Sequence, residues 1–278
     1  MANYTAADIK ALRERTGAGM MDVKKALDEA NGDAEKALEF IRIKGLKGAT
    51  KREGRSTAEG LVAAAVENGV GVMVEVNCET DFVAKAAPFI EFSNKVLATA
   101  LSSGAADIET LLAVDVDGKP MSEVVIEAGA LLGEKVAIRR IARIEGATVD
   151  AYLHKTSKDL PAQVGVLFAV DGAGEGAAVV AHDVAVHIAA MSPTFVSRDE
   201  VSPETVENER RIAAETAQAE GKPEAAMSKI VEGRLTGFFK EIVLVDQSFA
   251  KDAKKSVGTV LDEAGVKAVA FARFRVGA

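Results

Sequence analysis

The chain has 278 residues, with 42 Asp and Glu against 34 Lys and Arg, and a formal net charge of −8. Its apolar share of 48% excludes a disordered chain, no uncharged apolar run is long enough for a membrane span, and the acidic balance gives no reason to expect nucleic acid as a partner. The single cysteine, Cys78, cannot form an internal disulfide, and the N-terminus lacks the features of an export signal. We therefore expect a cytoplasmic protein of several small domains.

Residues 1–45 are expected to form a head of three short helices. Thr5 and Asp8 have the spacing of a short capping box at the start of the first helix, and Gly17 is expected to end it. The third helix is expected to end at Gly45. A unit of this size buries little apolar surface, so a role in docking is expected.

Residues 46–58 are interpreted as a basic linker. The first 56 residues hold 12 Lys and Arg against 9 Asp and Glu, whereas the rest of the chain is acidic. Solvation alone explains such a charge run, and an RNA tether using Lys47, Lys51 and Arg52 is the alternative hypothesis.

Two related α+β units are expected to form the core, at residues 59–148 and at 149–198 joined with 241–278. Gly71-Val72 of the first aligns with Gly165-Val166 of the second at an offset of 94 residues, which indicates an internal duplication. Hairpins followed by helices predict antiparallel sheets rather than a doubly wound parallel sheet. The predicted strands are 61–66, 70–76, 136–144, 149–154, 164–170 and 268–276, and the predicted helices are 89–101, 122–132, 180–191 and 257–263.

Residues 199–240 are expected to form an inserted helical hairpin. Pro203 can open its first arm, and the turn at 221–223 separates the arms. The first arm carries many charges and few large apolar residues. It is therefore expected to project from the body or to meet a partner, and a partly buried hairpin without a binding role is the alternative.

No catalytic constellation is found in the sequence. The phosphate-binding loops and the G-x-S-x-G elbow are missing, and His154, His182 and His187 have no acidic or cysteine cluster to complete a metal site. Cys78 has no local base and is expected to be buried. We therefore expect neither an enzyme nor a bound metal or cofactor.

The segment 75–85 (EVNCETDFVAK) is the most informative part of the body, because it leaves a strand and places an acid beside a large aromatic residue. Thr80 or Asp81 could cap a helix while Phe82 packs in the core. Alternatively, Phe82 could be an exposed aromatic wedge beside a charge, since loops at strand ends often display binding groups.

Residues 12–27 (LRERTGAGMMDVKKAL) and 75–85 closely resemble the two signature segments of the bacterial elongation factor Ts family. The resemblance extends through Gly133-Glu134-Lys135, the helical hairpin, Glu232-Gly233-Arg234 and residues 271–276, so it covers nearly the whole chain. It implies a ubiquitin-associated-like head, a core of two related α+β subdomains and a hairpin that often mediates subunit contact. Pairing of this chain as a homodimer or within a heterotetramer is therefore a possibility to test.

The resemblance further implies a guanine-nucleotide exchange factor that binds elongation factor Tu in its GDP form and promotes release of GDP and magnesium. The family's role in loosening the ion is carried to Thr80, Asp81, Phe82 and Val83. The resemblance places the head residues Arg13, Met20 and Met21, and more weakly His154, in contact with the GTPase. Met20 and Met21 could equally be core residues of a helix.

Two features depart from many members of the family. The loop at 155–163 is longer, which weakens the placement of His154, and the chain stops at Ala278 where many relatives continue into a helical module, so contacts from that module are not expected. A competing hypothesis is an adaptor that binds proteins through the helical head without affecting nucleotide turnover. That hypothesis leaves Asp81 and Phe82 without a role.

Overall fold

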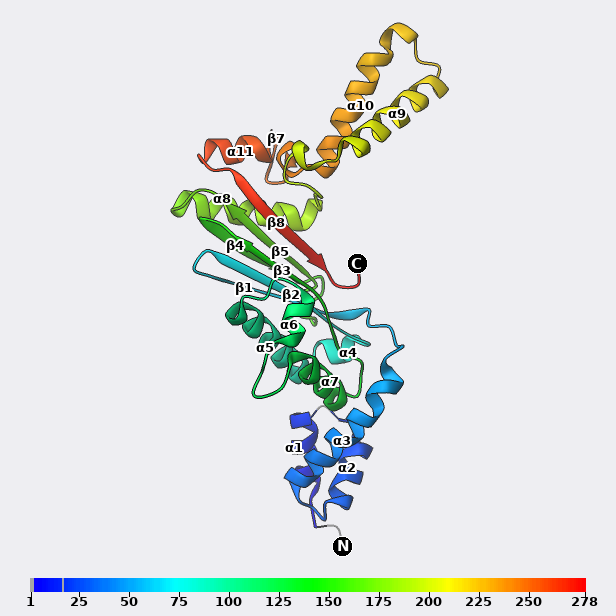
Figure 1. Cartoon of the computed structure of the whole chain (residues 1–278), viewed down its shortest axis with the longest axis vertical. Helices are drawn as coiled ribbons and strands as arrows, with labels where there is room; N and C mark the ends of the chain where they lie inside the picture. Colours follow the sequence, from blue (N-terminus) through cyan, green and yellow to red (C-terminus); the bar gives the residue numbers. More distant parts are fainter. Residues whose placement is uncertain (1–2, 17) are drawn as a thin grey trace.

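The computed structural model describes residues 3–16 and 18–278, apart from the side chains of residues 46, 47 and 49–51. Gly17, expected to end the first helix, and the side chains of Lys47 and Lys51 therefore lie outside the described part. The molecule is elongated, with the head at one end, the layered core in the middle and the helical hairpin at the other end (Figure 1).

Three helices make up the head: α1 (Ala6–Thr16), α2 (Met20–Glu29) and α3 (Ala34–Arg52). The predicted capping box is confirmed, because the Thr5 amide donates to Asp8 Oδ2 at 2.7 Å and the Asp8 amide donates to Thr5 Oγ1 at 3.3 Å. The prediction that the third helix ends at Gly45 is wrong. Gly45 is a packing position, since a Cβ there would lie 2.4 Å from the Cβ of Ala130 in a neighbouring helix. The helix therefore continues to Arg52 through most of the predicted linker.

The core contains two three-stranded antiparallel sheets of the same design. In each, a hairpin supplies two strands and a later strand pairs with the second strand of the hairpin. The predicted strands and the mixed α+β class are confirmed. The first sheet contains β1 (Glu59–Glu67), β2 (Val70–Cys78) and β3 (Ala137–Glu145), and the second contains β4 (Thr148–His154), β5 (Val164–Val170) and β8 (Ala268–Arg275).

The two sheets pack face to face through equivalent residues, which supports the predicted duplication. A Cβ at Gly71 would lie 3.1 Å from Leu167, and a Cβ at Gly165 would lie 2.7 Å from Met73. Leu167 stands 94 residues after Met73, the same offset that relates the two glycines. Each sheet therefore uses a glycine to admit the central side chain of the other.

Helices cover the outer face of each sheet, so the core has four layers (Figure 1). The alternating residues of β2 and β5 explain this order, because one set faces the other sheet and the second set faces helices. The first sheet carries α4 (Asp81–Ala84), α5 (Ala87–Ser103), α6 (Ile108–Ala113) and α7 (Met121–Leu132), and the second carries α8 (Glu175–Met191) and α11 (Val257–Glu263). The short helices α4 and α6 were not predicted.

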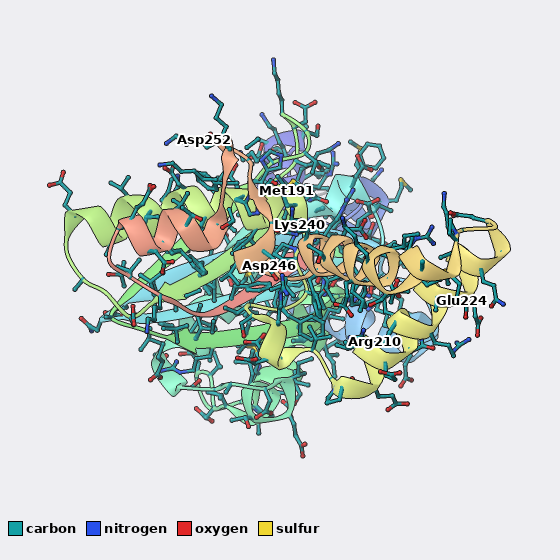
Figure 2. All side chains as sticks on the ribbon, turned by 90° about the horizontal axis from the view of Figure 1, so that it is seen from above. Met191, Arg210, Glu224, Lys240, Asp246 and Asp252 are labelled. Atoms are coloured by element: carbon teal, nitrogen blue, oxygen red, sulfur yellow. The ribbon has the colours of Figure 1, made fainter. Side chains whose placement is uncertain are left out.

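The hairpin consists of α9 (Pro203–Ala219) and α10 (Met227–Ile242) and projects from the second sheet's side of the core. Seen from above, Glu224 lies at its far end, whereas Lys240 and Asp246 lie near the body (Figure 2). A small apolar cluster holds the arms together: Ala213, Val231 and Leu235. None of the described helices has the length and apolar character needed to cross a membrane. The short elements nearby are η1 (Arg198–Glu200), η2 (Glu224–Ala226), η3 (Leu244–Asp246), β6 (Ser248–Phe249) and β7 (Asp252–Ser256).

Candidate functional site: an exposed aromatic tip

The segment after β2 forms an exposed tip on a buried base. The last residue of β2, Cys78, is fully buried, and two residues later the Thr80 hydroxyl caps α4 by accepting from the Val83 amide at 3.4 Å. The Phe82 side chain points outward and is 73% exposed, which is rare for a large aromatic residue. We call residues 79–85 the tip.

Glu134, which is distant from the tip in the sequence, clamps it through hydrogen bonds. Its carboxylate accepts hydrogen bonds from the backbone amides of Glu79 and Thr80, both at 3.0 Å, and from the Thr80 hydroxyl at 2.5 Å. Hydrogen bonds to an ionised acceptor are roughly twice as strong as neutral ones. The tip is therefore held by one carboxylate that immediately follows the end of α7, where Gly133 adopts a left-handed C-cap.

A second carboxylate, that of Glu79, links the same two segments, and here the tip supplies the acceptor. Glu79 Oε1 accepts from the Lys135 amide at 2.6 Å, and Arg55 lies 3.2 Å from Glu79 Oε2. The Lys135 ammonium in turn donates to the backbone carbonyls of Glu53 and Arg55. Segments 53–55, 79–80 and 134–135 are thus joined in one polar network, which fixes the tip relative to the end of α3.

Lys85 contacts both Asp81 and Phe82. Its ammonium lies 3.2 Å from Asp81 Oδ2 and 4.5 Å from the centre of the Phe82 ring. Such a cation over an aromatic face contributes about 0.5–1 kcal/mol at an exposed site. In the unbound protein Asp81 is therefore paired, and Phe82 is oriented without being covered.

The four predicted tip residues lie together in the structure, but their side chains differ in burial. Thr80 is half-buried against Glu134, and Val83 packs against the core of the first sheet. Phe82 faces outward, and the Asp81 side chain is about half-exposed. Thr80 is a helix cap, as one alternative predicted, but the helix that it caps is the unpredicted α4 and not the following α5. The part of that alternative in which Phe82 packs in the core is wrong.

The three predicted head residues are all exposed. Arg13 lies on α1, while Met20 and Met21 open α2 and are 57% and 76% exposed. The hypothesis that the two methionines belong to the core is therefore wrong. The head's interior is built from other residues, among them Leu12 and Leu27.

The head is docked on the core through α7. Arg42 forms an ion pair with Glu127, Gly45 packs on Ala130, and Leu131 contacts the head's apolar cluster. The same helix ends beside Glu134, so a single helix contacts both the head and the tip. A groove of about 690 Å³ remains between α2, α3 and α7.

His154 lies exposed at the end of β4, with its Nδ1 3.1 Å from the Tyr152 hydroxyl. His182 pairs with Asp150 at 3.2 Å, while His187 is buried, with its Nε2 2.9 Å from Gln247 Oε1. Burial lowers the pKa of His187, although the hydrogen bond with Gln247 opposes this shift. The histidines therefore do not converge, and the described residues contain no group of side chains suited to holding a metal ion.

Cys78 is buried as predicted. Burial, with the negative charge of Glu134 adding to it, raises the pKa of the thiol to about 12. The thiol is consequently protonated at neutral pH, whereas a nucleophilic cysteine must be in the thiolate form.

Comparison with known proteins agrees with this architecture. Residues 79–278 match the family model described as Elongation factor TS. The whole chain is 80% identical over 277 residues to "Elongation factor Ts" of Pseudarthrobacter chlorophenolicus, with both chains fully covered. The chain belongs to the elongation factor Ts family. Fully covered relatives of the same printed name occur in Renibacterium salmoninarum at 80% identity and in Kineococcus radiotolerans at 55%.

Membership of the elongation factor Ts family makes this chain a translation elongation factor, as the signature segments predicted. The sequence does not predict the clamp, although Glu134-Lys135 belongs to the segments that resemble the family. The missing information is that Glu134 lies 54 residues from Thr80 in the chain and contacts it only through the fold. An isolated acid after a helix-ending glycine was the only local signal.

Proposed function

We propose that this elongation factor Ts family member is a guanine-nucleotide exchange factor that binds elongation factor Tu carrying GDP and promotes release of GDP and magnesium. The observation that carries this proposal is the 73% exposed Phe82 on a clamped tip. A rigid aromatic residue that is free of its own core can bury its ring in a partner at little ordering cost.

The physical basis is reciprocal coupling between two ligands of the GTPase. If the exchange factor weakens nucleotide binding by some factor, the nucleotide weakens binding of the exchange factor by the same factor at equilibrium. No covalent bond changes, so the protein is not an enzyme in the chemical sense. It is proposed to act in the cytoplasm, with the head and the hairpin adding contacts.

The tip residues have different roles in this proposal. The Phe82 ring enters between partner elements near the magnesium-binding segment, and the Asp81 carboxylate perturbs the polar groups that hold the ion. Magnesium needs near-ideal octahedral geometry at 2.0–2.1 Å, so a small displacement of its ligands costs binding energy. Thr80 and Val83 hold the tip in place, and Glu134 prevents it from moving when the partner presses against it.

Burial of the Phe82 ring alone does not supply the free energy that a large acceleration of GDP release requires. A thousandfold acceleration of GDP release requires about 4 kcal/mol of differential interaction. Burying one phenylalanine side chain contributes about 1.5–3 kcal/mol. Asp81 and the exposed head residues Arg13, Met20 and Met21 are therefore proposed to supply the remainder, with His154 as a further contact.

The deciding experiment is stopped-flow release of a fluorescent GDP from elongation factor Tu, with and without this protein. We expect release to accelerate by at least a hundredfold at saturating exchange factor, and added magnesium to oppose the effect. Binding to the GTPase without faster release would instead support the adaptor hypothesis.

A further inference from the structure

A lysine-rimmed groove lies directly beside the tip. It has a volume of about 440 Å³ and lies between α5, the outer edge of β1 and the loop that follows β4. Its apolar lining includes Ile90, Leu97, Leu153 and Leu160. We call this feature the β1-edge groove.

The charged side chains around this groove are mostly positive. Three lysines line it, Lys85, Lys155 and Lys158, against a single acid, Asp159. This is unusual for a chain with a formal net charge of −8. Apolar surface beside several ammonium groups suits a segment that carries carboxylates around an apolar side chain.

The wall of the groove is fixed in place. The Val62 amide donates to the Ala162 carbonyl at 2.9 Å, and the Gln163 side-chain amide donates to the Gly60 carbonyl at 2.8 Å. The Gln163 amide also closes the loop by donating to the His154 carbonyl at 3.0 Å. The loop 155–162 is therefore attached to the edge of β1 at its far end, while Lys155 and Lys158 remain exposed.

Lys85 makes the groove continuous with the tip. The same ammonium that lines the groove lies 3.2 Å from Asp81 and over the Phe82 ring. A partner that surrounds Phe82 therefore lies against the groove as well. A carboxylate entering the groove would also compete with Asp81 for Lys85, leaving Asp81 free to act on the partner.

We propose that the β1-edge groove binds an acidic surface segment of the GTPase that Phe82 contacts, with Lys155 and Lys158 attracting its carboxylates. This inference rests on the proposed exchange function and adds a second contact to it. The loop 155–162, which forms one wall of the groove, supplies both lysines. A second copy of the chain is the competing occupant, and the continuity with the tip argues against it.

The first test is charge reversal of the double variant Lys155→Glu, Lys158→Glu. We expect the concentration of exchange factor that gives half-maximal GDP release to rise about tenfold at low salt, with a much smaller fall in the maximal rate. Raising the ionic strength to about 0.5 M should remove most of the difference. The matched control is Lys254→Glu, Lys267→Glu, which makes the same change in net charge on exposed residues of the second unit.

The outcomes separate the two proposals. If the wild type accelerates release and the groove variant behaves like the control, the groove proposal is overturned while the exchange function stands. A photo-crosslinking amino acid in place of Leu160 provides a readout that does not depend on release. Cross-linking to a GTPase peptide rich in Asp and Glu supports the groove, whereas a cross-linked homodimer, a basic peptide or no product overturns it, whatever the release rates are.

Discussion

The two core units have the same scaffold but end their central strands differently. Eight residues separate β2 from α5, and they form α4 and the clamped tip, whereas only four separate β5 from α8. In the second unit Gly174, with φ at 100°, leads straight into the helix without an exposed aromatic residue. The sheet-and-helix scaffold is thus common to both units, and the proposed difference in function lies in the loop that follows the central strand.

The corresponding positions at the ends of these strands differ as well: Cys78 is the buried last residue of β2, whereas Gly172 is a half-buried residue just after β5. Gly172 stands 94 residues after Cys78. A Cβ at Gly172 would lie 2.2 Å from Val266 Cγ1, whereas the Cys78 side chain is accommodated in the core of the first unit. The short loop after β5 is therefore tightly packed, whereas the first unit accommodates a longer loop after β2.

The largest expected effect is that of Phe82→Ala. We expect about a 30-fold slower stimulated GDP release, because loss of a central aromatic contact costs about 2 kcal/mol or more. Thermal unfolding should be unchanged, since the ring is exposed. The control is Val179→Ala in the second unit, which truncates an apolar side chain that is 58% exposed. Equal release rates for the two variants would refute the role of the tip.

Removal of the clamp should have a smaller effect on the same activity. Glu134→Ala leaves two backbone amides and one hydroxyl of the tip without their acceptor, at a cost of about 1–3 kcal/mol. We expect stimulated release to fall about tenfold and the amides of Glu79 and Thr80 to exchange hydrogen faster.

Hydrogen exchange measured by NMR or mass spectrometry tests the clamp directly. The control is Glu67→Ala at the exposed end of β1, beside the turn to β2, and it should change neither quantity. Unchanged protection of the tip in Glu134→Ala would show that the carboxylate does not hold it.

The packing of the second loop can be tested with a pair of glycines. Gly172→Ala should lower the free energy of unfolding by about 1–3 kcal/mol, because Val266 is buried and stiff. Gly176→Ala, in the first turn of α8 with open space around it, should be neutral or stabilising by up to about 1 kcal/mol. Urea unfolding of both variants measures the difference, and equal values would contradict the close packing of Gly172.

The smallest effect concerns Cys78 and appears only at high pH. Its folded pKa of about 12 exceeds the usual 9.0, so the unfolded chain loses the thiol proton first. The free energy of unfolding should therefore fall as pH rises above 9, by about 1.4 kcal/mol at pH 10 from this group. Comparison of wild type with Cys78→Ala isolates the contribution. Identical pH dependences would show that the thiol is not protected.

Local and repeated features could be predicted from the sequence. The Thr5–Asp8 capping box, the paired strands and the internal duplication depend on short spacings, which the sequence displays directly. The continuation of α3 beyond Gly45 could not be predicted, because the glycine is explained by a contact with α7. The exposure of Phe82 was one of two open alternatives, since the local pattern suits a core residue equally well. Only the fold brings Glu134 to Thr80 and so decides which side chain is displayed.

The attachment of both head and tip to α7 has a consequence for partner choice. Ala130 packs under the head, and four residues later Glu134 holds the tip. The separation between the proposed contacts Met20 and Phe82 is then set by a helix rather than by a flexible linker. Under the proposed function, a protein with suitable chemistry at both places but at the wrong spacing would bind only one of them, so the distance between the two contacts would contribute to specificity.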